Sequence, residues 1–310
     1  MTHSPPLDAE LSLLRYAPAV PVGWQLGRKL LRMNTLMTRP MEGVMRDDVV
    51  IPNLDGTANI RLFICRPQDP TETMPVILWL HGGGMVAGHY KQDSGFMDIW
   101  AKRLGAFVVS VDYRLAPEAK APAALDDCIA AWQWITTQTA RGIDTTRMAV
   151  GGASAGGGLA ASTVQRLVDL GGVKPVFQLL IYPMLDDRTV VRFDPDRRYY
   201  MWTPDCNRYG WTSYLGVPPG SAEVPPYASA ARRPDLSGLP PTWIGVGSLD
   251  LFHDEDMDYA RRLRESGVPV EEYVAVGAPH AFDTIYGKAK VTLDFWDSHF
   301  NALRRALCLD

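Results

Sequence analysis

Short apolar runs alternate with helix-like segments along most of this 310-residue sequence, and this alternation constrains the fold more than any other feature. Eight runs have the length and residue types of strands: Asp48–Ile51, Ile60–Cys65, Val76–Leu80, Ala106–Val111, Met148–Gly151, Phe177–Tyr182, Trp243–Val246 and Tyr273–Val276. Helix-like segments accompany the later runs at Ser94–Leu104, Ala123–Thr137, Ala155–Leu170, Asp256–Ser266 and Leu293–Leu307. The alternation predicts an α/β fold with a mostly parallel eight-stranded sheet and helices on both faces. Asp55-Gly56, between the first two runs, predicts an antiparallel hairpin at the edge.

Two regions, residues 1–46 and 186–233, do not follow this alternation. The first contains a predicted helix around Trp24–Met37, and the second is rich in Tyr, Trp and Pro without the periodicity of strands. We expect both to fold over the carboxyl ends of the strands as a helical cap, because sites in open α/β sheets lie at those ends. Residues 47–185 and 234–310 then form the two parts of the core.

Charge and composition exclude several classes of partner. The formal net charge is -4 with both signs mixed along the chain, and no basic block is present, so we expect no nucleic acid partner. Residues 1–14 lack the pattern of a signal peptide, and no apolar run approaches the ~20 residues of a membrane helix. We therefore expect a cytoplasmic protein without membrane insertion. The four cysteines are scattered without a CxxC pair, which predicts reduced, mostly buried thiols and no zinc site.

The segment Gly152-Ala153-Ser154-Ala155-Gly156 directly follows a predicted strand and opens a predicted helix. A nucleophile elbow requires this context, because its turn is sharp and only small residues can flank the serine. Ser154 would project above the sheet at a helix N-terminus, where the helix dipole favours an anion. Taken alone, the motif is equally compatible with a phosphate-binding or tightly packed turn.

A second glycine-rich turn, His81-Gly82-Gly83-Gly84, ends another predicted strand. Consecutive glycines let backbone N–H groups approach a ligand without side chains in the way. Such donors stabilise the oxyanion of acyl transfer together with the amide of the residue after the serine, here Ala155. A flexible turn without function is the alternative for this segment.

A nucleophilic serine needs a base, and the base needs an orienting acid. The order serine, acid, histidine is typical of such elbows, and Asp250 and His280 fit it because each lies in a loop after a predicted strand. Asp254 competes for the role of acid, but it is more typical of the first turn of the next helix. His253, beside Asp254 and Glu255, is expected on a solvated surface.

These segments resemble the bacterial hormone-sensitive-lipase-like esterases of the α/β-hydrolase superfamily. The resemblance covers roughly residues 75–282 and is carried by His81–Gly84, Asp112–Glu118, Gly152–Gly157, Leu239-Pro240-Pro241, Asp250 with Asp254-Glu255, and Pro279–Phe282. It implies an α/β-hydrolase fold without cofactor or metal, in a monomer or homodimer. It also implies site roles: nucleophile Ser154, base His280, acid Asp250, and oxyanion donors Gly83, Gly84 and Ala155.

The sequence departs from the family pattern at several positions near the expected substrate pocket. Ala153 stands where Asp is usual, and Met85 stands where an aromatic residue is common. We predict substrate contacts at Met85, Tyr200, Trp202 and Trp211. The aromatic residues among them would either line an apolar pocket or pack the cap onto the core.

The sequence thus predicts a serine carboxylesterase that hydrolyses short- to medium-chain carboxylic esters, with a small-molecule ester as its partner. The same triad would serve an amide, formamide or lactone hydrolase, so the leaving group stays open at this point. Some relatives are receptors for small molecules that lack the triad histidine, whereas this sequence keeps His280.

Overall fold

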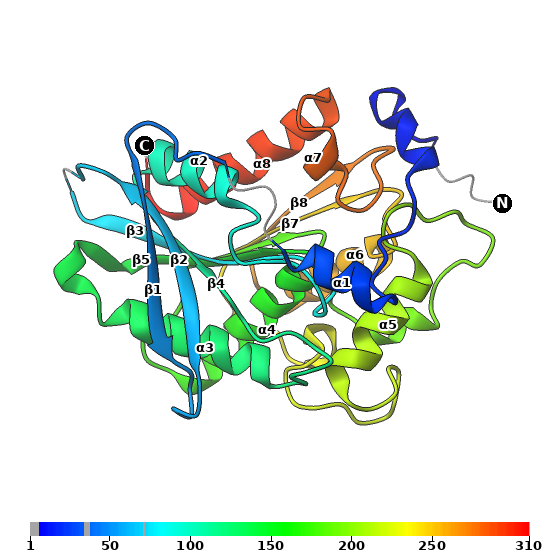
Figure 1. Ribbon diagram of the computed structural model, residues 1–310, viewed down its shortest axis with the longest axis horizontal. Coiled ribbons are helices and arrows are strands. Elements are labelled where there is room, and N and C mark those ends of the chain that lie inside the picture. Colours follow the sequence, from blue (N-terminus) through cyan, green and yellow to red (C-terminus); the bar gives the residue numbers. More distant parts are fainter. Residues whose placement is uncertain (1–5, 34–37, 71, 310) are drawn as a thin grey trace.

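A computed structural model describes residues 6–33, 38–70 and 72–309. Its strands form a single sheet in the order β1-β2-β4-β3-β5-β6-β7-β8 (Figure 1). The bounds are β1 Val44–Pro52, β2 Asn59–Pro67, β3 Met74–Leu80, β4 Phe107–Val111, β5 Ile143–Ala153, β6 Phe177–Ile181, β7 Thr242–Gly247 and β8 Val270–Ala275. β2 pairs antiparallel with β1 and β4, and the other neighbours pair parallel. The predicted mostly parallel, eight-stranded α/β fold is confirmed.

Helices cover both faces of the sheet. In Figure 1, α2 (Ser94–Leu104) and α8 (Lys290–Ala306) lie above it, and α3 (Ala123–Thr136) and α4 (Ala155–Leu170) lie below. α6 (His253–Glu265) joins the second face, because its buried residues belong to the same core cluster as those of α3 and α4. Successive side chains of a strand point to opposite faces; accordingly Leu78 of β3 packs in that cluster and Trp79 packs against α2.

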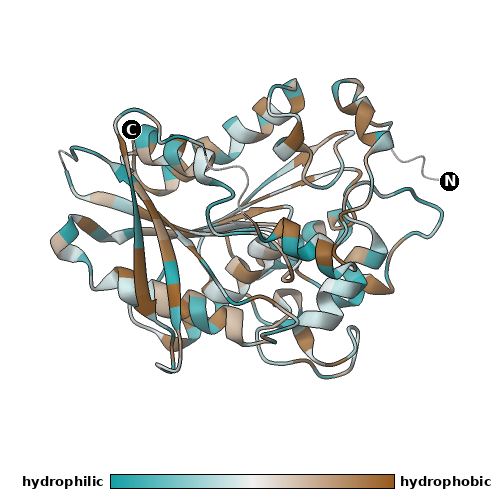
Figure 2. Cartoon of the chain, viewed as in Figure 1, coloured by the Kyte–Doolittle hydropathy of each residue, from teal (hydrophilic) through white to brown (hydrophobic). Residues whose placement is uncertain are grey.

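The edge hairpin differs from the central strands in its pattern of burial. Every residue of β3 is buried, as is typical of a strand covered on both faces. β1, at the edge, exposes several side chains, and Figure 2 shows both hydrophobic and hydrophilic bands along the β1–β2 hairpin. In its turn, the Asp55 carboxylate accepts a hydrogen bond from the Thr57 amide at 2.9 Å, so the predicted Asp-Gly turn is confirmed.

The two regions outside the alternation contain short helices that lie side by side. α1 (Gln25–Leu31) is shorter than the helix predicted from the sequence, of which residues 34–37 lie outside the described residues. It runs beside α5 (Pro204–Leu215), with the Arg28 guanidinium 5.0 Å from the centre of the Tyr209 ring (Figure 1). The remaining short helices are η1 Ala9–Tyr16, η2 Thr139–Arg141, η3 Asp187–Val190, η4 Ala230–Arg232 and α7 Phe282–Ile285. That these regions act as a cap stays a prediction.

Two further sequence predictions concern the thiols and the membrane. All four cysteines are free, and Cys65, Cys128 and Cys206 are buried while Cys308 is exposed. Among the described helices, none combines the length and apolar character needed to cross a membrane. The predicted location and oligomeric state stay predictions.

Candidate active site

Ser154 occupies a strained turn between β5 and α4. Its backbone has φ 57° and ψ −122°, a conformation that residues other than glycine seldom adopt. The turn is possible because Gly152 and Gly156 lack side chains: a Cβ on Gly156 would lie 2.1 Å from the Leu80 carbonyl oxygen, and one on Gly152 would lie 2.2 Å from that of Gly156. The Ser154 amide also donates to the Ile181 carbonyl at 2.8 Å. The serine is therefore fixed at the carboxyl ends of the central strands.

The predicted serine, histidine and acid form one connected row of side chains. The Ser154 Oγ lies 2.9 Å from Nε2 of His280, and Nδ1 of His280 lies 2.7 Å from Oδ2 of Asp250. All three residues are buried, with exposed fractions of 6%, 4% and 1% in that order. The other oxygen of Asp250 accepts the Phe252 amide at 2.9 Å, which fixes the plane of the carboxylate.

The two competing acids lie in different environments. Asp254 has a 90% exposed side chain and contacts Nδ1 of the half-buried His253 at 2.8 Å, so it does not reach His280. The structure brings Asp250 to the histidine and leaves Asp254 on the surface.

The glycine turn predicted to donate to an oxyanion lies directly beside the nucleophile. A Cβ on Gly82 would lie 3.4 Å from Cβ of Ser154. Gly83 and Gly84 have φ values of 136° and 62°, and the Gly83 carbonyl accepts the amides of Val86 and Ala87, which closes the turn. The turn therefore approaches Ser154 with bare backbone.

His81 stabilises this turn through hydrogen bonds and ring stacking. Its Nδ1 lies 2.9 Å from the Gly82 carbonyl oxygen, and its own carbonyl accepts a hydrogen bond from the Tyr113 hydroxyl at 2.6 Å. The rings of His81 and Tyr113 stack with centroids 4.3 Å apart. Burial lowers the pKa of His81 to about 4, so its ring is neutral near neutral pH.

The backbone N–H groups of Gly83, Gly84 and Ala155 have no acceptor within the described part of the chain. The amides of Gly83 and Gly84 donate to no group there, and the amide of Ala155 is the first of α4, where helix geometry offers no partner. These are the donors that the sequence assigns to an oxyanion.

Of the four predicted substrate contacts, Trp202 is the one with a described contact to the triad. Its indole is 3% exposed and lies 6.2 Å from the His280 ring, and its Cη2 atom would be 2.1 Å from a Cβ on Gly84. Trp211 packs against Tyr214 inside the molecule, and the Arg198 guanidinium covers Tyr200. Met85 is buried directly after the glycine turn. Substrate contact by all four stays a prediction.

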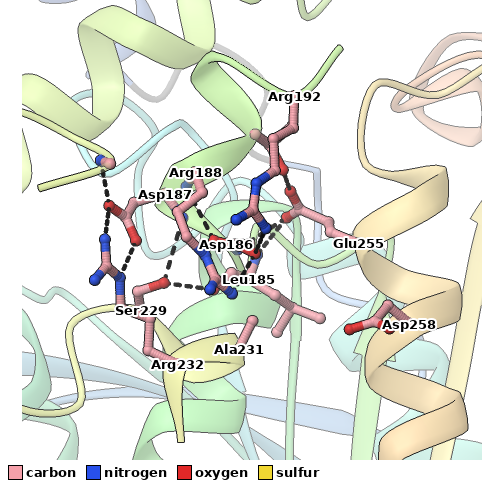
Figure 3. A network of polar contacts seen from close by, with 12 residues as sticks. Leu185, Asp186, Asp187, Arg188, Arg192, Ser229, Ala231, Arg232, Glu255 and Asp258 are labelled. Carbon is pink, nitrogen blue, oxygen red and sulfur yellow. Dashed lines mark hydrogen bonds and ion pairs between the residues drawn. The ribbon is translucent and has the colours of Figure 1, made fainter. Parts of the chain in front are cut away.

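A polar network joins the two ends of the region 186–233 to each other and fastens the first end to the core (Figure 3). The Asp187 carboxylate accepts from the Arg232 guanidinium at 2.6 and 2.8 Å, so residues near the two ends are joined. Glu255 accepts from the amides of Leu185 and Asp186, at 2.6 and 3.2 Å, and also from the Thr189 hydroxyl. At this helix start, where we expected His253 on a solvated surface, His253 is half-buried and Asp254 is exposed. Glu255 is buried, and burial raises its pKa well above the ordinary value.

Two polar residues beside His280 were not identified from the sequence. Tyr182, just after β6, contacts the His280 ring edge to face at 4.9 Å, and its hydroxyl donates to Asp283 at 2.8 Å. Their positions in the sequence could have indicated them, because Tyr182 directly follows strand β6 and Asp283 stands three residues after His280. Among the described residues, no three His, Cys, Asp or Glu side chains group together as metal ligands do.

Comparisons with known proteins agree with this geometry. A family described as alpha/beta hydrolase fold matches residues 77–284. The chain is similar to esterase LipI of Mycobacterium tuberculosis, with 33% identity over 297 residues (89% of this chain and 87% of LipI). It is 32% identical over 241 residues to an ethyl acetate hydrolase of Pseudomonas putida (76% and 74%).

Among solved structures, a bacterial heroin esterase superposes with a TM-score of 0.91 at 35% identity and covers 99% of both chains. This overlap extends over the elements that carry Ser154, Asp250 and His280. The chain belongs to the α/β-hydrolase fold family, in its hormone-sensitive-lipase-like branch, and is a carboxylic ester hydrolase.

Proposed function

We propose that this enzyme hydrolyses short- to medium-chain carboxylic esters by two-step acyl transfer through Ser154. The observation that carries the proposal is the connected row Ser154–His280–Asp250, with contacts of 2.9 and 2.7 Å in a buried site. His280 takes the proton of the Ser154 hydroxyl as Oγ attacks the ester carbonyl carbon. Asp250 accepts from Nδ1 of His280, which leaves Nε2 free to act as the base and stabilises the imidazolium.

The oxyanion of the tetrahedral intermediate is held by the amides of Gly83, Gly84 and Ala155. The positive φ values of the two glycines and the helix start at Ala155 support this assignment, because they leave N–H groups without acceptors within the described residues next to Ser154. The intermediate collapses when His280 returns its proton to the leaving alcohol. Water then attacks the acyl-enzyme by the same route, releasing the carboxylic acid and restoring Ser154.

Two observations support a preference for short to medium acyl groups. Trp202 and α5 both press on the glycine turn: a Cβ on Gly210 would lie 2.7 Å from the Gly84 carbonyl oxygen. Because Trp202 and α5 lie this close to the proposed oxyanion donors, they leave room for small acyl groups beside Ser154. The P. putida relative is named for ethyl acetate, an ester with a short acyl group.

The test is hydrolysis of p-nitrophenyl esters from acetate to palmitate by the wild type and by Ser154→Ala. We expect the highest kcat/KM on the shorter esters and a loss of activity in the variant by several orders of magnitude. Preferential hydrolysis of palmitate would contradict the chain-length proposal, and near-normal activity of folded Ser154→Ala would contradict the mechanism. Faster cleavage of matched amides, formamides or lactones than of esters would assign another leaving group to the same site.

A further inference from the structure

A second buried carboxylate lies close to the histidine of the triad, and the proposed mechanism does not use it. The side chain belongs to Asp283, which is 5% exposed and stands in the first turn of α7, three residues after His280. One oxygen accepts a hydrogen bond from the Tyr182 hydroxyl at 2.8 Å, and the other accepts one from the Trp296 indole N–H at 3.2 Å. Donors from two other parts of the fold therefore fix this carboxylate.

Tyr182 connects Asp283 with the catalytic site. Its ring meets the His280 imidazole edge to face, with centroids 4.9 Å apart, and Phe252 contacts the same imidazole at 5.1 Å. The Tyr182 backbone is held at φ 34°, a left-handed conformation that is unusual for a bulky residue, and its amide donates to the Gly245 carbonyl at 2.7 Å. Tyr182 is thus held at both ends, by the bond from its amide to Gly245 of β7 and by the bond from its hydroxyl to Asp283, and these bonds fix its ring against His280.

The charged groups around His280 come from several elements. Asp250, after β7, bonds directly to Nδ1, and Asp283, on α7, lies close enough for its charge to interact with that of His280. Asp93, just before α2, interacts with Asp283, and its carboxylate accepts a hydrogen bond from the Trp79 indole N–H at 2.8 Å. Burial raises the pKa of Asp283, whereas the bonds from Trp296 and Tyr182 and the charge on His280 favour its ionised form.

We propose that Tyr182 and Asp283 are positioning residues for His280. The hydrogen-bonded Tyr182 ring keeps the imidazole aligned between Ser154 and Asp250. The Asp283 carboxylate adds negative charge near the imidazolium that forms when Ser154 loses its proton. Asp283 exchanges no proton with the substrate, and the inference rests on the proposed triad mechanism.

The test compares pH profiles of kcat and kcat/KM for Asp283→Asn, Tyr182→Phe and the double variant on p-nitrophenyl acetate. Asn keeps an oxygen for the Tyr182 hydroxyl but removes the charge, so the imidazolium is less stable and the acidic limb moves to lower pH by about half a pH unit. We expect kcat to fall roughly threefold to tenfold while KM stays within about twofold. Tyr182→Phe should shift the limb in the same direction by less.

Because the hydroxyl acts through Asp283, the double variant should match Asp283→Asn instead of adding the two effects. Tyr259→Phe is the matched control: that tyrosine is also fully buried, and its hydroxyl is bonded to Gln165 instead of Asp283. It should leave the acidic limb unchanged. If Asp283→Asn does not fold, Tyr182→Phe carries the test with the same two readouts.

An unchanged acidic limb and kcat in a folded Asp283→Asn variant would overturn the inference, as would an equal shift in Tyr259→Phe. Ser154→Ala, measured in parallel, separates the two levels of the argument. An active Ser154→Ala would overturn the triad mechanism itself. An inactive Ser154→Ala with an unchanged Asp283→Asn would overturn only the role of Tyr182 and Asp283.

Discussion

One added methyl group, in Gly84→Ala, should strongly impair catalysis. A Cβ at this position would lie 2.1 Å from Cη2 of Trp202, closer than any ordinary carbon contact. Either the indole or the Gly84 amide must move, and both lie at the catalytic site, since the indole is 6.2 Å from the His280 ring. The substitution therefore disturbs the proposed oxyanion donor or the wall beside it.

The magnitude follows from two separate costs. An alanine at φ 62° carries about 1–2 kcal/mol of backbone strain, which acts on stability. Loss of one oxyanion donor typically costs ~2.7–4 kcal/mol in the transition state, which corresponds to a fall of about 10²–10³ in kcat. We expect Gly84→Ala to lower kcat/KM on p-nitrophenyl acetate by about a hundredfold or more.

Gly105→Ala is the matched control, because Gly105 has a similar φ of 60° and a Cβ on it would meet no neighbouring heavy atom within 4 Å. It should lose the same stability in urea unfolding and keep kcat/KM within about twofold of the wild type. A folded Gly84→Ala enzyme within about threefold of wild-type kcat/KM would refute the assigned oxyanion site. A comparable loss of activity in Gly105→Ala would attribute the effect to strain alone.

Three other predictions concern the triad acid and the surroundings of the site, and two of them include a control substitution. Asp250→Asn should lower kcat roughly a thousandfold or more, whereas Asp254→Asn should keep kcat within about twofold of the wild type. Equal losses of kcat in the two variants would contradict the assignment of Asp250 as the triad acid. Asp256 is buried without a hydrogen-bond partner within the described residues, and burial raises its pKa well above the ordinary value. The unfolded chain then binds fewer protons than the folded one as pH rises above about 4, so this carboxyl lowers stability toward neutral pH. Asp256→Asn should raise Tm, relative to the wild type, more at pH 8 than at pH 4.5, and a difference in Tm that does not depend on pH would contradict this. Asp187→Ala leaves Arg232 without its buried partner and should lower the free energy of unfolding in urea by about 3 kcal/mol. Asp258→Ala, at an exposed ion pair, should cost about 0.5 kcal/mol or less; equal costs would contradict a stabilising role of the Asp187–Arg232 pair.

The sequence was most informative where the local pattern and the fold agree. Each of the eight apolar runs is a strand, and the helix predicted at Ser94–Leu104 has those bounds in the structure. Parallel strands buried on both faces produce continuous apolar runs, which are easily distinguished from the amphipathic helices between them. The turn at Ser154 was also predictable from local sequence, because only small residues fit around this serine and the sequence places glycines there.

The region 186–233 was less predictable, because its order depends on contacts with distant residues. α5 has a cap at Thr203 and a proline at its first position, but its aromatic-rich sequence has weak amphipathic character, and it was not predicted. Its placement depends on the Asp187–Arg232 pair and on Glu255, about 70 residues from the amides that it accepts. No local pattern encodes such contacts, and an acidic helix start is more often solvated than buried.

The same limit applies to the side chains around the catalytic histidine. Tyr182 and Asp283 are about 100 residues apart, and their hydrogen bond exists only because β6 and the loop before α7 meet at the same end of the sheet. Likewise, Trp202 was one of several candidate aromatic residues, and only the fold distinguishes its contact with Gly84 from the packing of Trp211.

The central claim is that Ser154 is a nucleophile activated by His280. The most direct measurement is intact-protein mass spectrometry after treatment with a fluorophosphonate, followed by peptide mapping of the adduct. We predict a single adduct on Ser154 in the wild type, much slower labelling in His280→Ala, and no adduct in Ser154→Ala. An adduct on another residue, or equal labelling of folded Ser154→Ala, would contradict the account.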